Sequence, residues 1–135
     1  MVKRVFVDTS ALLTLLDRSD SRHDAARVCL QGLADAELVT HGYVVAESLA
    51  VVRRRFGVDG ATTLLDDVLP AIEVIPVDAV VHTAALARYR ASLPSGTSFV
   101  DNVSFELMAR DAIETAFAFD ADFISAGIAV IPVGT

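Results

Sequence analysis

Apolar runs and helical periodicities alternate along the chain, a pattern typical of an α/β domain. Short apolar runs predict strands, and apolar residues that recur every three or four positions predict the helices between them. The predicted strands cover residues 2–7, 38–40, 72–77, 115–119 and 128–131. The predicted helices cover residues 10–16, 23–36, 45–56, 59–69, 79–91 and 98–109.

Turn and capping residues mark the ends of several of these predicted elements. Gly57 ends the third predicted helix, Pro70 stops the fourth, and the Ser98 hydroxyl can cap the last one. The segment 122–127 is too short for a full crossover helix, so we expect the last strand to be a short edge piece. The pattern leaves the direction of that strand open. Because the chain has no repeat or linker, we expect a single domain over residues 1–135.

Composition and charge narrow the class of protein. A hydrophobic content of 53% with 21% charged residues is typical of a compact globular chain. The one cysteine, Cys29, cannot form an intrachain disulfide, and no stretch approaches the roughly 20 apolar residues that span a bilayer. We therefore expect a soluble, cytoplasmic protein with no membrane partner. The net charge of −7 argues against a general nucleic-acid binder, but not against a nuclease with local positive charge at residues 53–55.

Two aspartates follow predicted strands directly: Asp8 after the run Arg4–Val7, and Asp120 after residues 116–119. Ligands of parallel α/β sheets bind at the carboxyl ends of the strands. Carboxylates gathered there repel each other unless they are protonated or bridged by a cation, and such hard oxygen ligands suit Mg²⁺ or Mn²⁺. The pattern therefore indicates a metal-dependent enzyme. Either aspartate alone can also be a simple cap or turn residue, and Asp122 competes with Asp120 for the role.

Asp101 and Glu47 are the other acidic candidates. Asp101 shares a helix face with Phe105 and Met108, where an unpartnered carboxylate is costly to bury, although a first-turn Asp can also be partly solvated. The apolar stripe of the third predicted helix consists of Val45, Leu49, Val52 and Phe56. Glu47 points away from that stripe, so it either faces solvent or reaches a cleft through its own side of the helix.

The order of these residues resembles that of the PIN-domain ribonucleases, and it is most similar to the VapC-type toxins of bacterial and archaeal toxin–antitoxin pairs. The distinctive parts are residues 8–12, which read Asp-Thr-Ser-Ala-Leu, and residues 98–101, which read Ser-Phe-Val-Asp. Glu47 and the segment 119–123 follow the same order. The match covers essentially the whole chain in length, motif order and spacing.

The resemblance implies a fold, an activity and a cofactor. The fold is a three-layer α/β/α sandwich around a parallel sheet of four or five strands. The activity is that of an endoribonuclease that depends on Mg²⁺ or Mn²⁺ and hydrolyses RNA phosphodiester bonds. The acidic catalytic and metal-binding residues would be Asp8, Glu47, Asp101 and Asp120. The hydroxyls that hold them or approach a phosphate would be Thr9, Ser10 and Ser98.

The resemblance also implies partners beside the RNA substrate. These are a small antitoxin whose tail covers the acidic site and a second copy of the chain in a homodimer. The stripe of the third helix is a candidate surface for either, although such a stripe is more often ordinary core. The chain departs from the family's pattern at Ala118, where many relatives carry Thr or Ser, and at Asp122, where a basic or polar residue is frequent. A catalytically weak or inactive PIN fold that binds RNA or protein is therefore the alternative.

Two other acidic α/β classes fit less well. A phosphatase of the haloacid-dehalogenase type needs a second Asp two residues after the first, where this chain has Ser10. A receiver-like phosphoacceptor needs an acidic pair after the first strand, where this chain offers only Asp8. No spacing among the histidines indicates a zinc site, and we interpret them as surface or helix-end residues: His23, His41 and His82.

Overall fold

The computed structural model describes residues 2–134, so Met1 and Thr135, the two ends of the predicted single domain, lie outside the described residues. Within that range, five strands form one parallel sheet in the order β3-β2-β1-β4-β5. The strands are β1 (Arg4–Val7), β2 (Glu37–His41), β3 (Glu73–Ile75), β4 (Thr115–Phe117) and β5 (Ala129–Ile131). All five predicted strands are confirmed, and β5, whose direction the sequence left open, runs parallel to β4.

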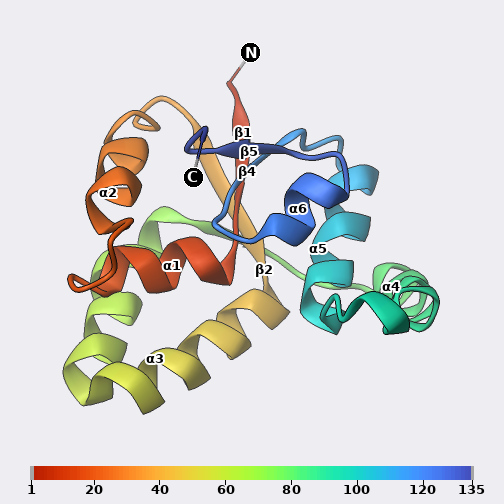
Figure 1. The fold of residues 1–135 in the computed structure, drawn as a ribbon, viewed down its shortest axis with the longest axis horizontal. Helices are drawn as coiled ribbons and strands as arrows, with labels where there is room; N and C mark the ends of the chain where they lie inside the picture. The colour runs from red at the N-terminus through yellow and green to blue at the C-terminus, as the bar shows by residue number, and fades with distance from the viewer. Residues whose placement is uncertain (1, 135) are drawn as a thin grey trace.

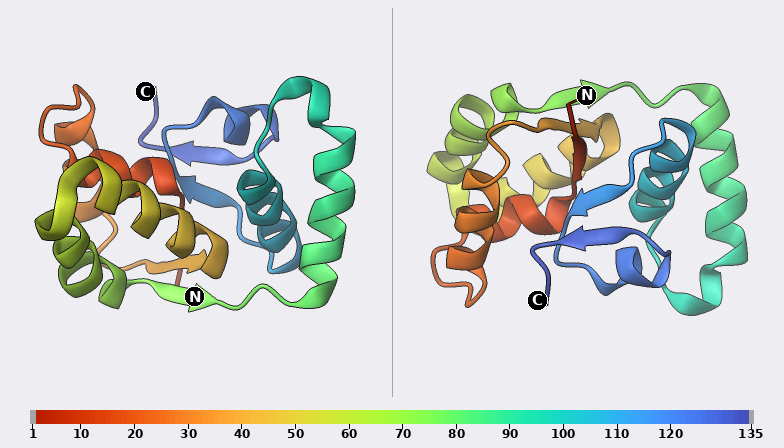
Figure 2. Two further views of the ribbon diagram at one scale, coloured as in Figure 1. Left: turned by 90° about the horizontal axis from the view of Figure 1, so that it is seen from below. Right: turned by 90° about the horizontal axis from the view of Figure 1, so that it is seen from above.

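Helices cover both faces of this sheet. Figure 1 names the elements, and Figure 2 shows α1, α2 and α3 on one face and α4, α5 and α6 on the other. The helices are α1 (Thr9–Leu16), α2 (His23–Gln31), α3 (Gly42–Thr63), α4 (Ala79–Ala91), α5 (Phe99–Arg110) and α6 (Ala121–Ser125). Short helical turns are η1 (Leu64–Val68), η2 (Leu69–Ala71) and η3 (Leu93–Ser95). The α/β/α sandwich is confirmed, and within residues 2–134 no helix is both long and apolar enough to cross a bilayer.

The core is centred on the middle of the sheet, where both faces are covered. In β1, Val5, Phe6 and Val7 are at most 1% exposed, and β4 is buried along its whole length. A continuous apolar strand of this kind belongs inside a parallel sheet rather than at its edge. Burial of a side chain such as Phe6 contributes roughly 2 kcal/mol. The central strands therefore fix the positions of the residues that follow them.

Side-chain caps define where five of the described helices begin, among them α4, which Asp78 caps. Asp8 caps α1, Ser98 caps α5 and Asp120 caps α6, in each case with a side-chain oxygen that accepts a backbone N–H. His41 caps α3, because its Nδ1 atom accepts the Tyr43 N–H at 3.2 Å. A cap of this kind contributes about 1 kcal/mol and fixes the side chain relative to the backbone. Three candidate site residues thus also start helices.

Several predicted boundaries differ from the structure, and two of the differences have a clear physical cause. α2 ends at Gln31 rather than at residue 36, because a run of turns that begins at Gly32 leads from the helix into β2. β4 ends at Phe117 rather than at Phe119, because the Phe119 N–H leaves the sheet and donates to the Ser10 hydroxyl at 2.9 Å. The second difference matters for the site, since it turns the chain toward α1 just before Asp120.

The break predicted at Gly57 is present, but the helix resumes after it. Gly57 has a φ of 73°, a left-handed conformation that glycine adopts at little cost. Helical structure continues to Thr63 in a new direction and passes into η1 and η2, which contains Pro70. The predicted helices 45–56 and 59–69 are therefore parts of one bent element.

Candidate metal centre

The order of the strands places the end of β1 at the centre of the molecule. From β1 the chain adds β2 and β3 on one side and then returns to add β4 and β5 on the other. In parallel sheets the ligand crevice lies at the carboxyl ends of the two strands where the order reverses, which here are β1 and β4. Asp8 follows β1 directly, and Asp120 follows β4 after two residues. The topology of the sheet therefore brings these two candidates together.

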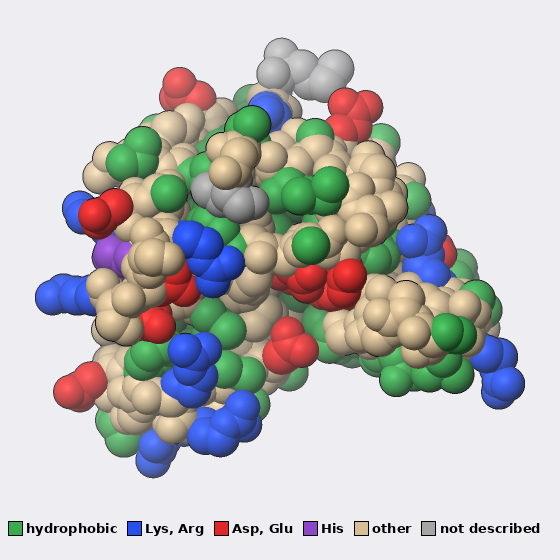
Figure 3. All heavy atoms as spheres, viewed as in Figure 1, with side chains coloured by type: hydrophobic (Ala, Val, Ile, Leu, Met, Phe, Trp, Pro, Cys, Tyr) green, Lys and Arg blue, Asp and Glu red, His purple; other side chains and the backbone are tan. Residues whose placement is uncertain are grey.

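Asp101 completes a cluster with these two aspartates. One carboxylate oxygen from each of Asp8, Asp101 and Asp120 lies within 4.8 Å of the other two. Asp8 is 3% exposed and Asp101 is 7% exposed, whereas Asp120 is half-buried. Figure 3 shows acidic side chains along the hollow that opens between the α3 side and the α4 side of the molecule. The structure thus gathers three of the four predicted acidic residues.

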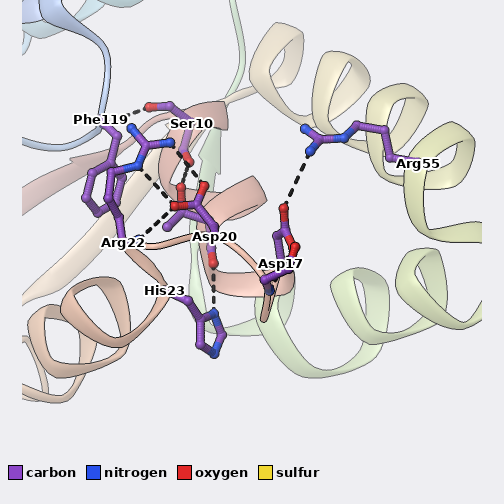
Figure 4. Close-up of polar contacts among 9 residues, drawn as sticks. Ser10, Asp17, Asp20, Arg22, His23, Arg55 and Phe119 are labelled. Carbon is purple, nitrogen blue, oxygen red and sulfur yellow. Dashed lines mark hydrogen bonds and ion pairs between the residues drawn. The ribbon is translucent and has the colours of Figure 1, made fainter.

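Ser10 holds the Asp8 carboxylate in place. It donates to one Asp8 oxygen through its backbone N–H at 3.1 Å and through its hydroxyl at 2.6 Å. The same hydroxyl accepts the Phe119 N–H at 2.9 Å, a contact drawn in Figure 4. Because Phe119 directly precedes Asp120, one serine joins the backbone beside Asp120 to the Asp8 carboxylate. Ser10 therefore fixes two of the three aspartates relative to each other.

Asp101 is positioned by the first turn of α5. The Ser98 hydroxyl accepts the Asp101 N–H at 3.0 Å, so this cap fixes the backbone from which the carboxylate projects. α5 is covered on more than one side: Phe105 is 6%, Met108 2% and Leu107 0% exposed. Such a tightly packed helix cannot roll to bring the Asp101 carboxylate out to solvent.

Burial and mutual repulsion raise the pKa values of two of these carboxyls. Desolvation raises the pKa of Asp8 from 3.8 to about 6, although the Ser10 hydrogen bonds oppose the shift. Desolvation, followed by the negative charge of Asp8, raises the pKa of Asp101 from 3.8 to about 9. Among residues 2–134, no Lys or Arg forms an ion pair with Asp8, Asp101 or Asp120. The described part of the chain therefore gathers acidic groups without supplying a cation to neutralise them.

The donor set of the cluster fits a divalent cation with hard oxygen ligands. Mg²⁺ binds oxygens at about 2.0–2.1 Å and is commonly held by one or two carboxylates together with waters and substrate phosphates. The oxygens of the three aspartates, within 4.8 Å of one another, need only small side-chain movements to close around one ion. A bound cation would favour the ionised carboxylates that burial opposes. The cluster of Asp8, Asp101 and Asp120 could therefore hold a metal ion.

Glu47 and Asp122 line the same hollow without joining the cluster. The hollow has a volume of about 340 Å³, and its wall comprises Asp8, Thr9, Ser10, Leu13, Glu47, Gly96, Ser98, Asp101, Asp120 and Asp122. Glu47 is half-buried and faces the hollow from α3, but it is not one of the three residues whose oxygens converge. The Asp122 N–H donates to the Asp120 carboxylate at 2.9 Å. Of the two competing aspartates, Asp120 lies in the cluster and Asp122 at its rim.

Thr9 and Ser98, the other predicted hydroxyl residues, have different surroundings. Thr9 is 6% exposed, and its hydroxyl accepts the hydroxyl of Ser48 on α3 at 3.2 Å. Ser48 adjoins Glu47, so this contact ties the start of α1 to the helix that carries Glu47. Ser98 is exposed and uses its hydroxyl to cap α5. Ser48 could not be recognised from sequence patterns, because its partner Thr9 lies 39 residues away.

His41 has a larger role than the sequence indicated. It is a helix-end residue, as predicted, but it is 0% exposed. Because its Nδ1 accepts the Tyr43 N–H, the proton is on Nε2, which donates to the Ser104 hydroxyl on α5 at 2.8 Å. Burial lowers the pKa of His41 to about 4, so the ring is neutral at pH 7. One imidazole therefore ties α3, which carries Glu47, to α5, which carries Asp101.

The apolar stripe of α3 lies partly in the core. Val52 is 0% exposed, and Leu49 and Phe56 are half-buried and pack against the core. Val45, near the start of the helix, is also half-buried. The stripe therefore packs against the core through Leu49, Val52 and Phe56, and its half-buried side chains also keep some exposed area.

Comparison with known proteins adds an independent line of information. The family described as PIN domain matches residues 5–128. The 23S rRNA-specific endonuclease VapC20 of Mycobacterium tuberculosis is 32% identical over 129 residues, which cover 91% of this chain and 94% of the relative. The crystal structure of VapC20, a sarcin-ricin loop cleaving toxin, matches with a TM-score of 0.78 and 31% identity over 92% of this chain and 95% of that chain. Promoter-DNA-bound VapBC2 from Rickettsia felis gives a TM-score of 0.71 at 16% identity over 94% and 96% of the two chains, a likeness of fold alone.

Proposed function

The chain belongs to the PIN-domain family, and from this premise we propose that it is a divalent-metal-dependent endoribonuclease that hydrolyses RNA phosphodiester bonds. The observation that carries the proposal is the convergence of Asp8, Asp101 and Asp120 within 4.8 Å at the switch point of the sheet. The name of the relative VapC20, a 23S rRNA-specific endonuclease, supports the same class of reaction.

In this proposal Asp8 and Asp101 are the principal metal ligands, because both are buried and their oxygens converge. Asp120 accepts the Asp122 N–H with one oxygen, Oδ1, and has a second oxygen with which to complete the site. When bound, Mg²⁺ or Mn²⁺ activates water and offsets the negative charge that develops on the phosphate during hydrolysis. We assign Glu47, on the wall of the hollow, or Asp120 to orient the attacking water and accept its proton.

Each of the three predicted hydroxyl residues contributes to this proposed metal site. Ser10 holds the Asp8 carboxylate, Ser98 fixes the first turn of α5, and Thr9 lines the hollow. Ala118 lacks the hydroxyl expected from the family's pattern, but Ser10 binds the Phe119 N–H that follows it. Support for the backbone before Asp120 therefore comes from α1, which favours an active enzyme over a binding module.

A cleavage assay with purified protein and end-labelled RNA tests the proposal. Cleavage should be absent in EDTA, rise with added Mg²⁺ or Mn²⁺, and fall to background in Asp8→Asn and Asp101→Asn. Asp24→Asn is the matched control, because the Asp24 side chain on α2 is 92% exposed, and it should cleave like the wild type. Wild-type rates in both site variants would contradict the metal role. RNA binding without cleavage by the wild type would instead favour the non-catalytic alternative.

We also propose that the protein is the toxin of a type II toxin–antitoxin pair, a homodimer that binds a small antitoxin. The resemblance to VapC20, itself a toxin, supports this role. An antitoxin tail that carries Arg or Lys would complement the aspartate cluster, which has no cationic partner within residues 2–134. The product of a neighbouring gene should copurify with the protein and inhibit cleavage, and light scattering should give the mass of a dimer. A monomeric mass, or cleavage that the neighbouring protein leaves unchanged, would contradict these assignments.

A further inference from the structure

Arg22 lies beside the segment that leads into Asp120. Its guanidinium carbon is 5.0 Å from the centre of the Phe119 ring, and Figure 4 shows the two side chains beside each other. Phe119 directly precedes Asp120, and its N–H is held by Ser10, which also holds Asp8. Arg22 is therefore linked to the aspartate cluster through Phe119 and Ser10, and within residues 2–134 it forms no ion pair with Asp8 or Asp120.

Asp20 fixes the Arg22 guanidinium in one orientation. Nε donates to one Asp20 oxygen at 3.1 Å, Nη2 donates to the other at 3.1 Å, and the Arg22 backbone N–H donates to Asp20 at 2.8 Å. Among residues 2–134 this fork leaves the Nη1 hydrogens and one Nη2 hydrogen without an acceptor. The side chain is 45% exposed, so these donors are open to a ligand. A planar, pre-oriented guanidinium of this kind is well suited to phosphate.

The segments around Arg22 carry more than half of the basic residues of the chain. Of its eleven Lys and Arg residues, six lie between positions 18 and 55: Arg18, Arg22, Arg27, Arg53, Arg54 and Arg55. Figure 3 shows Lys and Arg side chains gathered over α2 and α3, next to the acidic hollow. Arg55 on α3 is itself oriented by Asp17, with 3.5 Å between the charged atoms, as Figure 4 shows. Arginine side chains thus continue from Arg22 to α3, and both Arg22 and Arg55 are oriented by a neighbouring aspartate.

We propose that Arg22 binds an RNA backbone phosphate that flanks the scissile one, and that Arg55 extends this phosphate path along α3. The inference rests on the proposed ribonuclease function. Within residues 2–134 the wall of the hollow contains no Lys, Arg or His, so a metal ion there would attract the scissile phosphate but leave the neighbouring phosphates unpaired. Arg22, beside the Phe119 ring, is placed to supply positive charge to a flanking phosphate.

The competing explanation is that Arg22 only pairs with Asp20 to hold the turn before α2. The two explanations differ in what Asp20 does. If Arg22 is purely structural, removal of either partner should have the same effect. If Arg22 binds phosphate, loss of the Asp20 charge leaves the cation in place, and only loss of Arg22 weakens the attraction for RNA.

Steady-state cleavage of a mixed-sequence RNA oligonucleotide in Mg²⁺, measured over a series of salt concentrations, distinguishes these explanations. Arg22→Ala should raise KM about 5- to 10-fold with kcat nearly unchanged, as expected for one charged hydrogen-bonded contact. It should also flatten the plot of log(kcat/KM) against log[salt] by about 0.7. Asp20→Asn keeps the cation and an oxygen that can accept the Arg22 N–H, so it should keep the wild-type salt slope. Arg90→Ala, an exposed arginine on α4, is the matched control and should behave like the wild type.

Equal rises in KM for Arg22→Ala and Asp20→Asn would overturn the inference in favour of a structural ion pair. A wild-type KM and salt slope in Arg22→Ala would also overturn it. Arg22→Lys should recover the salt slope but only part of the wild-type affinity seen in KM, because Lys keeps the charge and loses the planar fork.

If the wild type failed to cleave, the proposed function would be contradicted. Fluorescence anisotropy of the labelled RNA with the same variants would then still test the role of Arg22.

Discussion

Replacement of Asp101 by Asn is expected to stabilise the metal-free protein at neutral pH. Asp101 is 7% exposed, and its pKa is raised from 3.8 to about 9, first by desolvation and then by the charge of Asp8. In the unfolded chain this carboxyl ionises near 3.8, whereas the folded protein keeps it protonated up to about pH 9. The folded state therefore binds the extra proton, and the free energy of unfolding falls as pH rises through this window, by about 1.4 kcal/mol per pH unit.

At pH 7 this linkage amounts to at most about 4 kcal/mol. Asn has nearly the same shape as Asp and no proton to lose, and its amide can donate to Asp120, which hydrogen-bonds the Asp101 side chain in the wild type. We therefore expect Asp101→Asn to raise the free energy of unfolding by about 2–4 kcal/mol at pH 7, and Tm by roughly 10 °C. At pH 4 the two proteins should differ little, because the carboxyl is then protonated in much of the unfolded state as well.

Thermal unfolding from pH 4 to pH 9, with and without Mg²⁺, measures this effect. Mg²⁺ at about 100 times its Kd should stabilise the wild type by about 3 kcal/mol, and Asp101→Asn should lose most of that gain. Asp111→Asn is the control at the other end of α5, where the carboxylate pairs with Arg110 at 3.2 Å, and it should show no gain that grows with pH. An Asp101→Asn protein that is less stable at pH 7, or whose gain is independent of pH, would refute the electrostatic reasoning.

Ser10→Ala should lower the free energy of unfolding in urea by about 1–3 kcal/mol, because the Phe119 N–H loses its acceptor. Since the Ser10 hydroxyl also lowers the pKa of Asp8, the pH of half-maximal cleavage should rise in this variant, and a fall would contradict the assignment. Ser104→Ala should cost about 1–3 kcal/mol, because it removes the acceptor of the buried His41 Nε2–H, and an unchanged urea midpoint would count against that bond. Burial holds the pKa of His41 at about 4, below its ordinary 6.5, so the wild type loses stability through this group as pH falls from 6.5 to 4. His41→Asn removes this titration. The difference in unfolding free energy between the wild type and this variant should therefore shrink by about 1.4 kcal/mol per pH unit as pH falls from 6.5 to 4.

Local patterns were enough to predict the central part of the fold. Val5, Phe6 and Val7 form an uninterrupted apolar run because β1 is covered on both faces, and the same burial makes Asp8 stand out after them. The aspartate that follows β4 could be found in the same way. For Asp101, the sequence supplied a second signal, since its helix is apolar on the face that the carboxylate shares.

Contacts between distant segments could not be predicted. The sequence shows that Ser10 can cap a helix, but not that its hydroxyl receives the N–H of a residue 109 positions later. His41 could be recognised as a helix-end residue, whereas its burial depends on Ser104, 63 positions away. Arg22 carried no signal at all, because its importance arises from the Phe119 ring that the turn after β4 brings beside it. Glu47 could not be assigned from periodicity, since the hollow it lines is formed by other elements.

Crystals of the wild-type protein soaked in Mn²⁺ show directly whether Asp8 and Asp101 hold a divalent cation. We expect one strong anomalous peak in the acidic hollow, within about 2.5 Å of a carboxylate oxygen of both Asp8 and Asp101. Soaked Asp101→Asn crystals should lose the peak while the positions of the surrounding helices stay the same. An empty hollow in the wild type at saturating Mn²⁺, or a peak held by other residues with Asp8 and Asp101 uncoordinated, would contradict the account.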